Sequence, residues 1–336
     1  MEEDLAKAKF FMNLALKKAW KYQLLTYPNP AVGCVITNEF DEILSVAAHK
    51  KAGHAHAELR AVKKALQKLN PKLKFPKNPN DLYEFILNNH ENLLQNAKAY
   101  VTLEPCSHFG KTPPCASLLA NLNFKKVFIG SKDVNLKKSG IDILKKSGVK
   151  VKTGICQKKC DELLEPFLAW QKGNFSFFKL AMSLNGVITG GIISNKLSRT
   201  HSHKLRSLVD LLVIGGNTVR IDRPILDTRL IKNAKNPDIL IYSHSKNFDE
   251  KIPLFSVRDR KVFIENSLES IKEKKFVIIE GGENFLKNLP KNIEWILIYQ
   301  SNRFLEKENI KLNLNLKILH KTKLGEDTLI WAKILK

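Results

Sequence analysis

The spacing of apolar residues along the first half of the chain predicts alternating helices and strands. Apolar positions at intervals of three and four residues indicate amphipathic helices, and short β-rich apolar runs such as AVGCVIT at 31–37 are typical of strands. This alternation predicts an α/β domain in which helices cover a sheet. The predicted helices cover residues 5–22, 58–69, 115–122 and 141–147, and the predicted strands cover residues 31–37, 43–48, 99–103 and 126–131.

The segment 70–96 interrupts this alternation and resembles an insertion. It is rich in Pro and Asn at first and then carries the pattern of one amphipathic helix. Two interpretations stay open for it, a solvated elaboration and part of an interface.

The pattern restarts near Phe175, which predicts a second α/β domain. A chain of 336 residues is long enough for two domains. We predict one domain over residues 1–153, a linker over 154–174 and a second domain over 175–336. In the second domain a helix is predicted over 199–209, and strands over 175–184, 211–216, 239–242, 261–264, 276–279 and 295–299.

Composition narrows the class of protein. No apolar run approaches the roughly 18–20 residues that cross a bilayer, and the acidic, amphipathic N-terminus is unlike a secretory signal. We therefore expect a cytoplasmic protein without a membrane partner. In that compartment its five Cys residues indicate a metal site or buried thiols rather than disulfides.

A formal net charge of +23 raises the alternative of a nucleic-acid-binding protein, such as an enzyme that edits tRNA. The excess comes mostly from Lys spread along the whole chain, and no cluster of Arg with interleaved aromatic residues stands out. We therefore expect no nucleic-acid partner. Attraction of anionic, phosphorylated small molecules needs only a local basic pocket.

The strongest chemical signal is His56-Ala57-Glu58 followed by Pro105-Cys106 and then by Cys115. One imidazole and two thiolates leave the fourth position of a tetrahedral zinc ion open, as catalytic zinc sites do. Glu58, two residues from the imidazole, is then placed to act as a general acid and base. This order of residues is the pattern of the zinc-dependent nucleobase deaminases.

The spacing of the two cysteines singles out one group of deaminases. Most cytidine and tRNA adenosine deaminases have C-x-x-C, whereas Cys106 and Cys115 lie at the two ends of a longer loop in TLEPCSHFGKTPPC. This segment, with PNPAVG at 28–33 and HKKAG at 49–53, resembles the bifunctional deaminase/reductase family of riboflavin biosynthesis. The resemblance covers nearly the whole chain apart from 70–96. It implies a cytidine-deaminase-like three-layer α/β/α domain followed by a dihydrofolate-reductase-like α/β domain.

For the first domain, the resemblance implies one zinc ion and a phosphorylated pyrimidine substrate. That substrate is 2,5-diamino-6-(5-phosphoribosylamino)pyrimidin-4(3H)-one, which the family deaminates at C2. Asn29 can also be only a turn residue, and Lys111 only a solvated loop lysine. The implied zinc ligands are His56, Cys106 and Cys115, the proton shuttle is Glu58, and the residues at substrate-contacting positions are Asn29, His49, His108 and Lys111.

For the second domain, the resemblance implies reduction of the ribosyl group to ribityl by NADPH. The glycine pairs after the apolar runs LLVI and FVIIE would let backbone amides approach a diphosphate. Lys179 is a candidate for assisting hydride transfer. The positions that match cofactor contacts are Ala181, Thr218, Asp222, Gly281 and Gly282, and those that match substrate contacts are Arg206, Leu226, Arg229 and Glu280.

The second domain also departs from the family pattern. Asn185 stands where the family has Asp, and the segment between Gly186 and Arg199 is shortened and lacks the usual Ser-x-Trp. These departures leave an alternative open, a deaminase whose reductase domain is a degenerate structural partner. The resemblance further leads us to expect a homo-oligomer.

Overall fold

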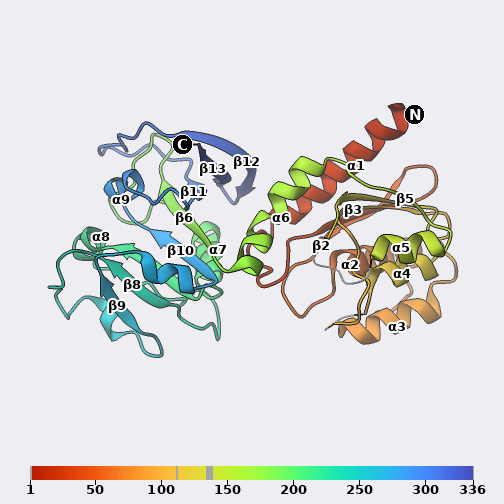
Figure 1. The fold of residues 1–336 in the computed structure, drawn as a ribbon, viewed down its shortest axis with the longest axis horizontal. Coiled ribbons are helices and arrows are strands. Elements are labelled where there is room, and N and C mark those ends of the chain that lie inside the picture. Colours follow the sequence, from red (N-terminus) through yellow and green to blue (C-terminus); the bar gives the residue numbers. More distant parts are fainter. Residues whose placement is uncertain (1, 111–112, 134–138, 336) are drawn as a thin grey trace. The chain divides into compact units, whose positions relative to one another are not determined.

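The computed structural model describes residues 2–110, 113–133 and 139–335 (Figure 1). The chain divides into two compact units, Met1–Phe167 and Leu168–Lys336. Each unit has its own sheet and its own hydrophobic core. Among the described residues, helices are too short or too polar to span a membrane.

The first unit is built on a sheet of five strands. They are β1 (Gly33–Thr37), β2 (Ile43–Ala48), β3 (Lys98–Leu103), β4 (Lys126–Ser131) and β5 (Lys150–Lys152). In the sheet they follow the order β2-β1-β3-β4-β5. The pairs that β1 makes with β2 and β3 are antiparallel, and the pairs β3–β4 and β4–β5 are parallel.

Helices cover both faces of this sheet. On one face α1 lies so close to β1 that a Cβ on Gly33 would stand 2.0 Å from the carbonyl oxygen of Ala15. The opposite face packs against α2, α4 and α5 and forms the main core. The expected three-layer α/β/α fold is therefore confirmed. The helices are α1 (Glu2–Trp20), α2 (Ala57–Leu69), α3 (Pro79–Asn89), α4 (Cys115–Asn121), α5 (Gly140–Lys146) and α6 (Gln157–Lys172).

The second unit contains an eight-stranded sheet with the order β12-β13-β11-β6-β10-β7-β8-β9. Strands from β11 to β9 in this order run parallel, whereas β13 is antiparallel to both β11 and β12. The strands are β6 (Phe175–Met182), β7 (Leu211–Gly215), β8 (Asp238–Tyr242), β9 (Val262–Glu265), β10 (Phe276–Glu280), β11 (Trp295–Gln300), β12 (Asn315–Leu324) and β13 (Asp327–Leu335). The helices are α7 (Lys196–Arg206), α8 (Gly216–Asp222) and α9 (Glu283–Lys287).

The central strands of this sheet bring chemical groups together at one edge. The carboxyl ends of parallel strands lie along the same side of the sheet, and ligands of open α/β sheets bind just beyond these ends. The register places Glu280 of β10 beside Lys179 of β6, and Ala181 of β6 beside Tyr299 of β11. A site at this edge follows from the strand order alone.

Several segments differ from what the apolar pattern indicates. The helix predicted over 199–209 begins at Lys196, because the side chain of Asn195 caps it by accepting from the Ser198 amide, and it ends at Arg206. The segment 154–174, predicted as a linker, is mostly occupied by α6, and the division between the two units falls within this helix. The hairpin of β12 and β13 has no counterpart among the predicted strands.

Candidate functional site

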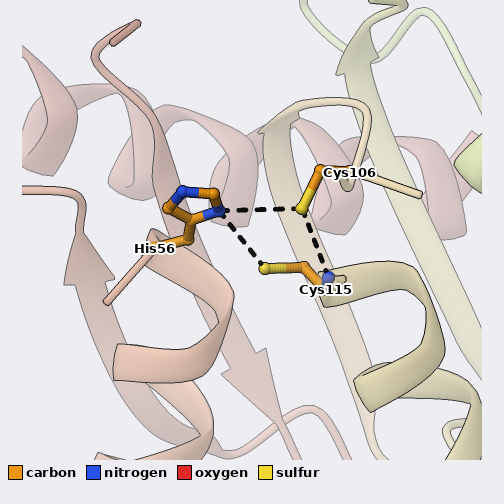
Figure 2. Close-up of side chains that lie close together, drawn as sticks. All are labelled: His56, Cys106 and Cys115. Atoms are coloured by element: carbon orange, nitrogen blue, oxygen red, sulfur yellow. Dashed lines mark hydrogen bonds between the residues drawn. The ribbon is translucent and has the colours of Figure 1, made fainter. Parts of the chain in front are cut away.

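His56, Cys106 and Cys115 converge at one point of the first unit (Figure 2). His56 is the residue that precedes α2, Cys106 follows β3, and Cys115 is the first residue of α4. The Nδ1 atom of His56 lies 3.7 Å from the Sγ atom of each cysteine. The Cys115 amide donates a hydrogen bond to the Cys106 sulfur at 3.3 Å.

This cluster fits a zinc ion. Bonds of about 2.3 Å to sulfur and about 2.0–2.1 Å to nitrogen at a tetrahedral angle hold those atoms about 3.6 Å apart. The observed 3.7 Å agrees, and all three ligand atoms lie within 4.8 Å of one another. Hydrogen bonding from Cys115, and then from His56, lowers the pKa of Cys106 and so favours the thiolate that a metal needs.

Glu58 lies in the first turn of α2, two residues from His56. The residue is only 4% exposed. Burial, and next the nearby Cys106 sulfur, raise the pKa of the Glu58 carboxyl to about 7. A carboxyl group with such a pKa can both accept and release a proton near neutral pH.

A cavity of about 380 Å³ lies beside this cluster. His49 is fixed on its wall, because its Nδ1 atom lies 3.2 Å from the Ala55 carbonyl oxygen and its Nε2 atom 3.2 Å from the Asn29 amide nitrogen. Burial lowers the pKa of His49 to about 4, so its ring is neutral at physiological pH. Lys111 falls outside the described residues. The predicted residues on the cavity wall are Asn29, His49, His56, Glu58, Cys106 and His108.

Glu104 lines the same cavity and was not singled out from the sequence. Its carboxylate accepts hydrogen bonds from the Ser139 hydroxyl at 2.9 Å and from the backbone amides of Ile141 and Asp133. It therefore ties the segment before α5 to the end of β3. The available signal was an acidic residue between a buried strand and Pro105-Cys106.

The second unit has a separate cavity, of about 280 Å³, at the carboxyl ends of β6, β7 and β10. Of the positions expected to contact a cofactor, Gly282 is not on this wall; it precedes α9, and a Cβ there would have nothing within 4 Å. The arrangement fits one part of a dinucleotide bound across the strand ends. The predicted residues on the wall are Lys179, Ala181, Arg206, Thr218, Asp222, Glu280 and Gly281.

A network of buried charges closes one side of this cavity. The Glu280 carboxylate accepts from Nε and Nη2 of Arg206 at 2.9 and 2.8 Å, and from Nζ of Lys179 at 3.3 Å. Burial alone would raise the pKa of Glu280, but Arg206 and then Lys179 outweigh it and hold that pKa at about 2. Two of the donor atoms of Arg206 are thus bound to a protein carboxylate.

Leu226 and Arg229 lie away from the cavity wall. Leu226 is buried, and its carbonyl oxygen accepts a hydrogen bond from Arg260 at 2.6 Å. The side chain of Arg229 is 55% exposed and pairs with Asp227 at 2.8 Å. Sequence reasoning instead missed a group of cavity residues, namely Ser198, Arg199, Ser202, His203 and Tyr299.

Comparison with known proteins shows which family the chain resembles in each half. Residues 5–131 match the family described as the cytidine and deoxycytidylate deaminase zinc-binding region, and residues 175–329 match the RibD C-terminal domain. The riboflavin biosynthesis protein RibD of Aquifex aeolicus is 30% identical over 301 residues, which cover 85% of this chain and 77% of that protein. RibD of Buchnera aphidicola is 30% identical over 307 residues, which cover 88% and 75%.

Solved structures share the fold over the whole chain. The deaminase/reductase of Thermotoga maritima aligns with a TM-score of 0.63 at 23% identity, and RibD of Acinetobacter baumannii with 0.62 at 24% identity. Each alignment covers 99% of this chain and 100% of the other. Both halves of the sequence and both sheets therefore lead to one conclusion: the chain belongs to the RibD family of riboflavin biosynthesis proteins.

Proposed function

We propose that this chain catalyses two steps of riboflavin biosynthesis. The first is hydrolytic deamination of 2,5-diamino-6-(5-phosphoribosylamino)pyrimidin-4(3H)-one, and the second is reduction of the ribosyl side chain by NADPH to give 5-amino-6-(5-phosphoribitylamino)uracil. The observation that carries this proposal is the convergence of His56, Cys106 and Cys115 beside a cavity that buried Glu58 also lines, in a chain whose second half matches the RibD C-terminal domain.

In the first half the protein's residues hold the metal, move protons and orient the ring. His56, Cys106 and Cys115 would hold the zinc ion, which would supply hydroxide near neutral pH by lowering the pKa of water. Glu58, with its raised pKa, would take up one proton of that water and deliver it to the ring nitrogen, and would then carry the remaining hydroxyl proton to the amino group, which leaves as ammonia. Asn29 and neutral His49 are held side by side and present hydrogen-bonding groups to the edge of the pyrimidine, with His108 and Lys111 assigned to the same substrate.

In the second half, NADPH supplies the hydride. Ala181, Thr218, Asp222, Gly281 and Gly282 are assigned to the cofactor, and Arg206, Leu226, Arg229 and Glu280 to the substrate. The ion pair with Glu280 fixes the ammonium group of Lys179 on the cavity wall, where it can assist hydride transfer by stabilising charge on the sugar oxygen.

Two assays on the zinc-loaded full chain test the proposal. The first measures ammonia released from the diamino-pyrimidinone phosphate, and the second measures NADPH oxidation with the deaminated intermediate. We expect both, and His56→Ala should lose only the first. Ammonia release without NADPH oxidation would favour the alternative of a degenerate reductase domain, which the match to the RibD C-terminal domain does not support. The predicted homo-oligomer is tested by light scattering of the same preparation.

A further inference from the structure

The segment 183–195 connects β6 to α7 and forms one side of the cavity of the second unit. Gly190 and Gly191 have φ angles of 97° and 93°, a left-handed backbone that glycine adopts at little cost. Two adjacent glycines have no side chains to pack, so contacts from elsewhere in the unit must keep this part of the backbone in one conformation. The residues of the segment that lie on the cavity wall are Ile188, Gly191, Ile192, Ile193 and Ser194.

Arg303 supplies such contacts from the connection that follows β11. Its Nη2 atom donates to the carbonyl oxygens of Ile192 and Ile193 at 2.7 and 2.8 Å. Its own carbonyl oxygen accepts a hydrogen bond from the Leu184 amide at 2.9 Å. Hydrogen bonds from a charged donor are stronger than those between neutral groups. Arg303 therefore holds the segment 183–195 both at its start and next to its glycines.

Asn185 joins the same two parts of the chain through its side-chain amide. Its Nδ2 atom donates to the carbonyl oxygen of Leu305 at 2.9 Å, and its Oδ1 atom accepts from the Leu305 amide at 3.1 Å. The Oδ1 atom also accepts from the Ser183 hydroxyl at 2.6 Å. An ionised Asp, the residue that the resembling family has at this position, only accepts hydrogen bonds and would set a carboxylate oxygen against the Leu305 carbonyl. Asn185 is therefore matched to this contact.

The other end of the segment is bound to the hairpin of β12 and β13. The backbone amide of Asn195 donates to the buried carboxylate of Asp327 at 2.8 Å, and its Nδ2 atom donates to the carbonyl oxygen of Leu324 at 2.7 Å. The segment is thus held at both ends and in the middle by protein groups. Among the described residues of the cavity wall neither Arg303 nor Asn185 is found, so both can act on a ligand only through the segment that they hold.

We propose that Arg303 and Asn185 are positioning residues that keep the segment 183–195 in place as a preformed wall of the second unit's cavity. This inference rests on the proposed function in so far as the ligands of that cavity are NADPH and the deaminated intermediate. A wall that is formed before binding spares the ligand the entropic cost of ordering the glycine turn, so less ligand is needed for half-saturation. The shortened segment and Asn185 then belong to one arrangement that supports the reductase.

The kinetic test compares Arg303→Met, Arg303→Lys and Asn185→Asp with wild type in the full-length, zinc-loaded protein. KM and kcat are measured for NADPH and for the deaminated intermediate. If the wall is formed in about a tenth of the variant molecules, KM rises about tenfold, whereas kcat stays within about twofold because bound ligand restores the wall. We expect this pattern for Arg303→Met and Asn185→Asp, and partial recovery for Arg303→Lys, which keeps a charged donor. The matched control is Arg258→Met, which removes an exposed arginine of the same unit and should change neither constant.

The two ligands distinguish what the wall contacts. A rise in KM for NADPH alone assigns the wall to the cofactor, a rise for the intermediate alone assigns it to the substrate, and a rise for both assigns it to both. Unchanged KM values for both ligands in Arg303→Met and Asn185→Asp would overturn the proposal.

Hydrogen exchange followed by mass spectrometry gives a readout that does not depend on turnover. Without ligand, the amides of residues 186–195 should exchange faster in Arg303→Met and in Asn185→Asp than in wild type and Arg258→Met. The buried central strand β10 is the internal reference, and its exchange should not change. Equal acceleration in β10 and in 186–195 would show a loss of global stability and would refute the positioning role, as would unchanged exchange of 186–195. If wild type oxidises no NADPH and Arg303→Met still accelerates exchange of 186–195 alone, the proposed reductase step fails and the positioning role stands.

Discussion

Glu280 lies at the end of β10 between two cations, and its environment decides its charge. Loss of water would favour the protonated carboxyl, yet Arg206 and Lys179 donate to both of its oxygens. The result is a carboxylate with a pKa of about 2. This carboxylate lies on the cavity wall, and it also neutralises two buried cations.

Replacing this carboxylate should destabilise the second unit. Glu280→Gln keeps the shape of the side chain but leaves Arg206 and Lys179 without a counter-charge, so we expect the free energy of unfolding to fall by about 3–5 kcal/mol. Urea unfolding measures it. The control is Glu269→Gln, which breaks an exposed ion pair with Lys272 and should change stability by less than about 1 kcal/mol. Equal losses in the two variants would contradict the account.

The same carboxylate gives a pH dependence of defined sign. Its pKa in the folded protein, about 2, lies below the ordinary value of 4.5, so folding favours the deprotonated form. The stability that this group contributes is fully present above pH 4.5 and is lost as the pH falls towards 2. We expect the difference in unfolding free energy between wild type and Glu280→Gln to shrink over that range. A difference that grows on acidification would show the opposite sign.

Glu58→Gln tests the proposed proton shuttle. The amide keeps the size of the side chain but cannot take up a proton, so ammonia release should fall by about 10²–10⁴-fold. Zinc content, measured by atomic absorption, and NADPH oxidation with the deaminated intermediate serve as internal controls and should stay at wild-type values. Ammonia release that persists at the wild-type rate would remove Glu58 from the reaction.

Residues differ in how far the sequence predicts them. His56, Glu58, Cys106 and Cys115 could be found because metal chemistry restricts both their types and their order. Ser198, Ser202 and His203 could not, because the polar segment SRTHSHK is typical of the solvated face of a helix. Only the packing of α7 against the strand ends of the sheet buries those groups beside a cavity.

At the scale of elements, α3 shows that the insertion is part of the first unit's core. Asn78 caps this helix by accepting from the amides of Asn80 and Asp81. The helix then buries Leu82, Tyr83 and Ile86 in the core that also contains α2 and α4. Tyr83 approaches the carbonyl oxygen of Pro114, the residue before Cys115, at 3.5 Å. The interpretation of 70–96 as only a solvated elaboration is therefore wrong for α3.

Replacing a buried and an exposed side chain of α3 by Ala should have unequal effects on the free energy of unfolding. Ile86 is 0% exposed, so Ile86→Ala should lower the unfolding free energy of the first unit by about 2–5 kcal/mol. Glu84 is exposed on the same helix, and Glu84→Ala should change it by less than about 0.5 kcal/mol. Denaturant unfolding followed by circular dichroism measures both. A loss below about 1 kcal/mol in Ile86→Ala would mean that α3 does not stabilise the core.

Elements were easiest to predict where apolar patterns were strong. The strand runs GCVIT and FVIIE are almost entirely buried, and both were found. The strand β12, in contrast, has only partly buried and exposed residues along NLKILHKTKL, so its apolar signal is weak. Pairing with β13 holds it in the sheet, and such long-range pairing is not visible in a local pattern.

At the scale of the whole molecule, each half has its own core and its own cavity. The core of the first unit contains residues from Val32 to Leu164, and that of the second contains residues from Phe178 to Ile334. The α6 helix runs from one unit into the other: Cys160 packs against Gly130, and Trp170 packs against Phe175 and Phe276. Separate cores imply that a change in the metal site is felt mainly by the first half.

Removing zinc from the intact chain should therefore separate the two activities. A metal that binds the folded state stabilises it by mass action, so a chelator should lower the unfolding temperature of the first unit and leave that of the second unchanged. Ammonia release should stop, whereas NADPH oxidation with the deaminated intermediate should continue at the rate of the zinc-loaded protein. Adding zinc back to the apo-protein should restore both the temperature and the release of ammonia. Loss of NADPH oxidation on chelation would show instead that the second half depends on the metal site, and separate cores would then not mean separate functions.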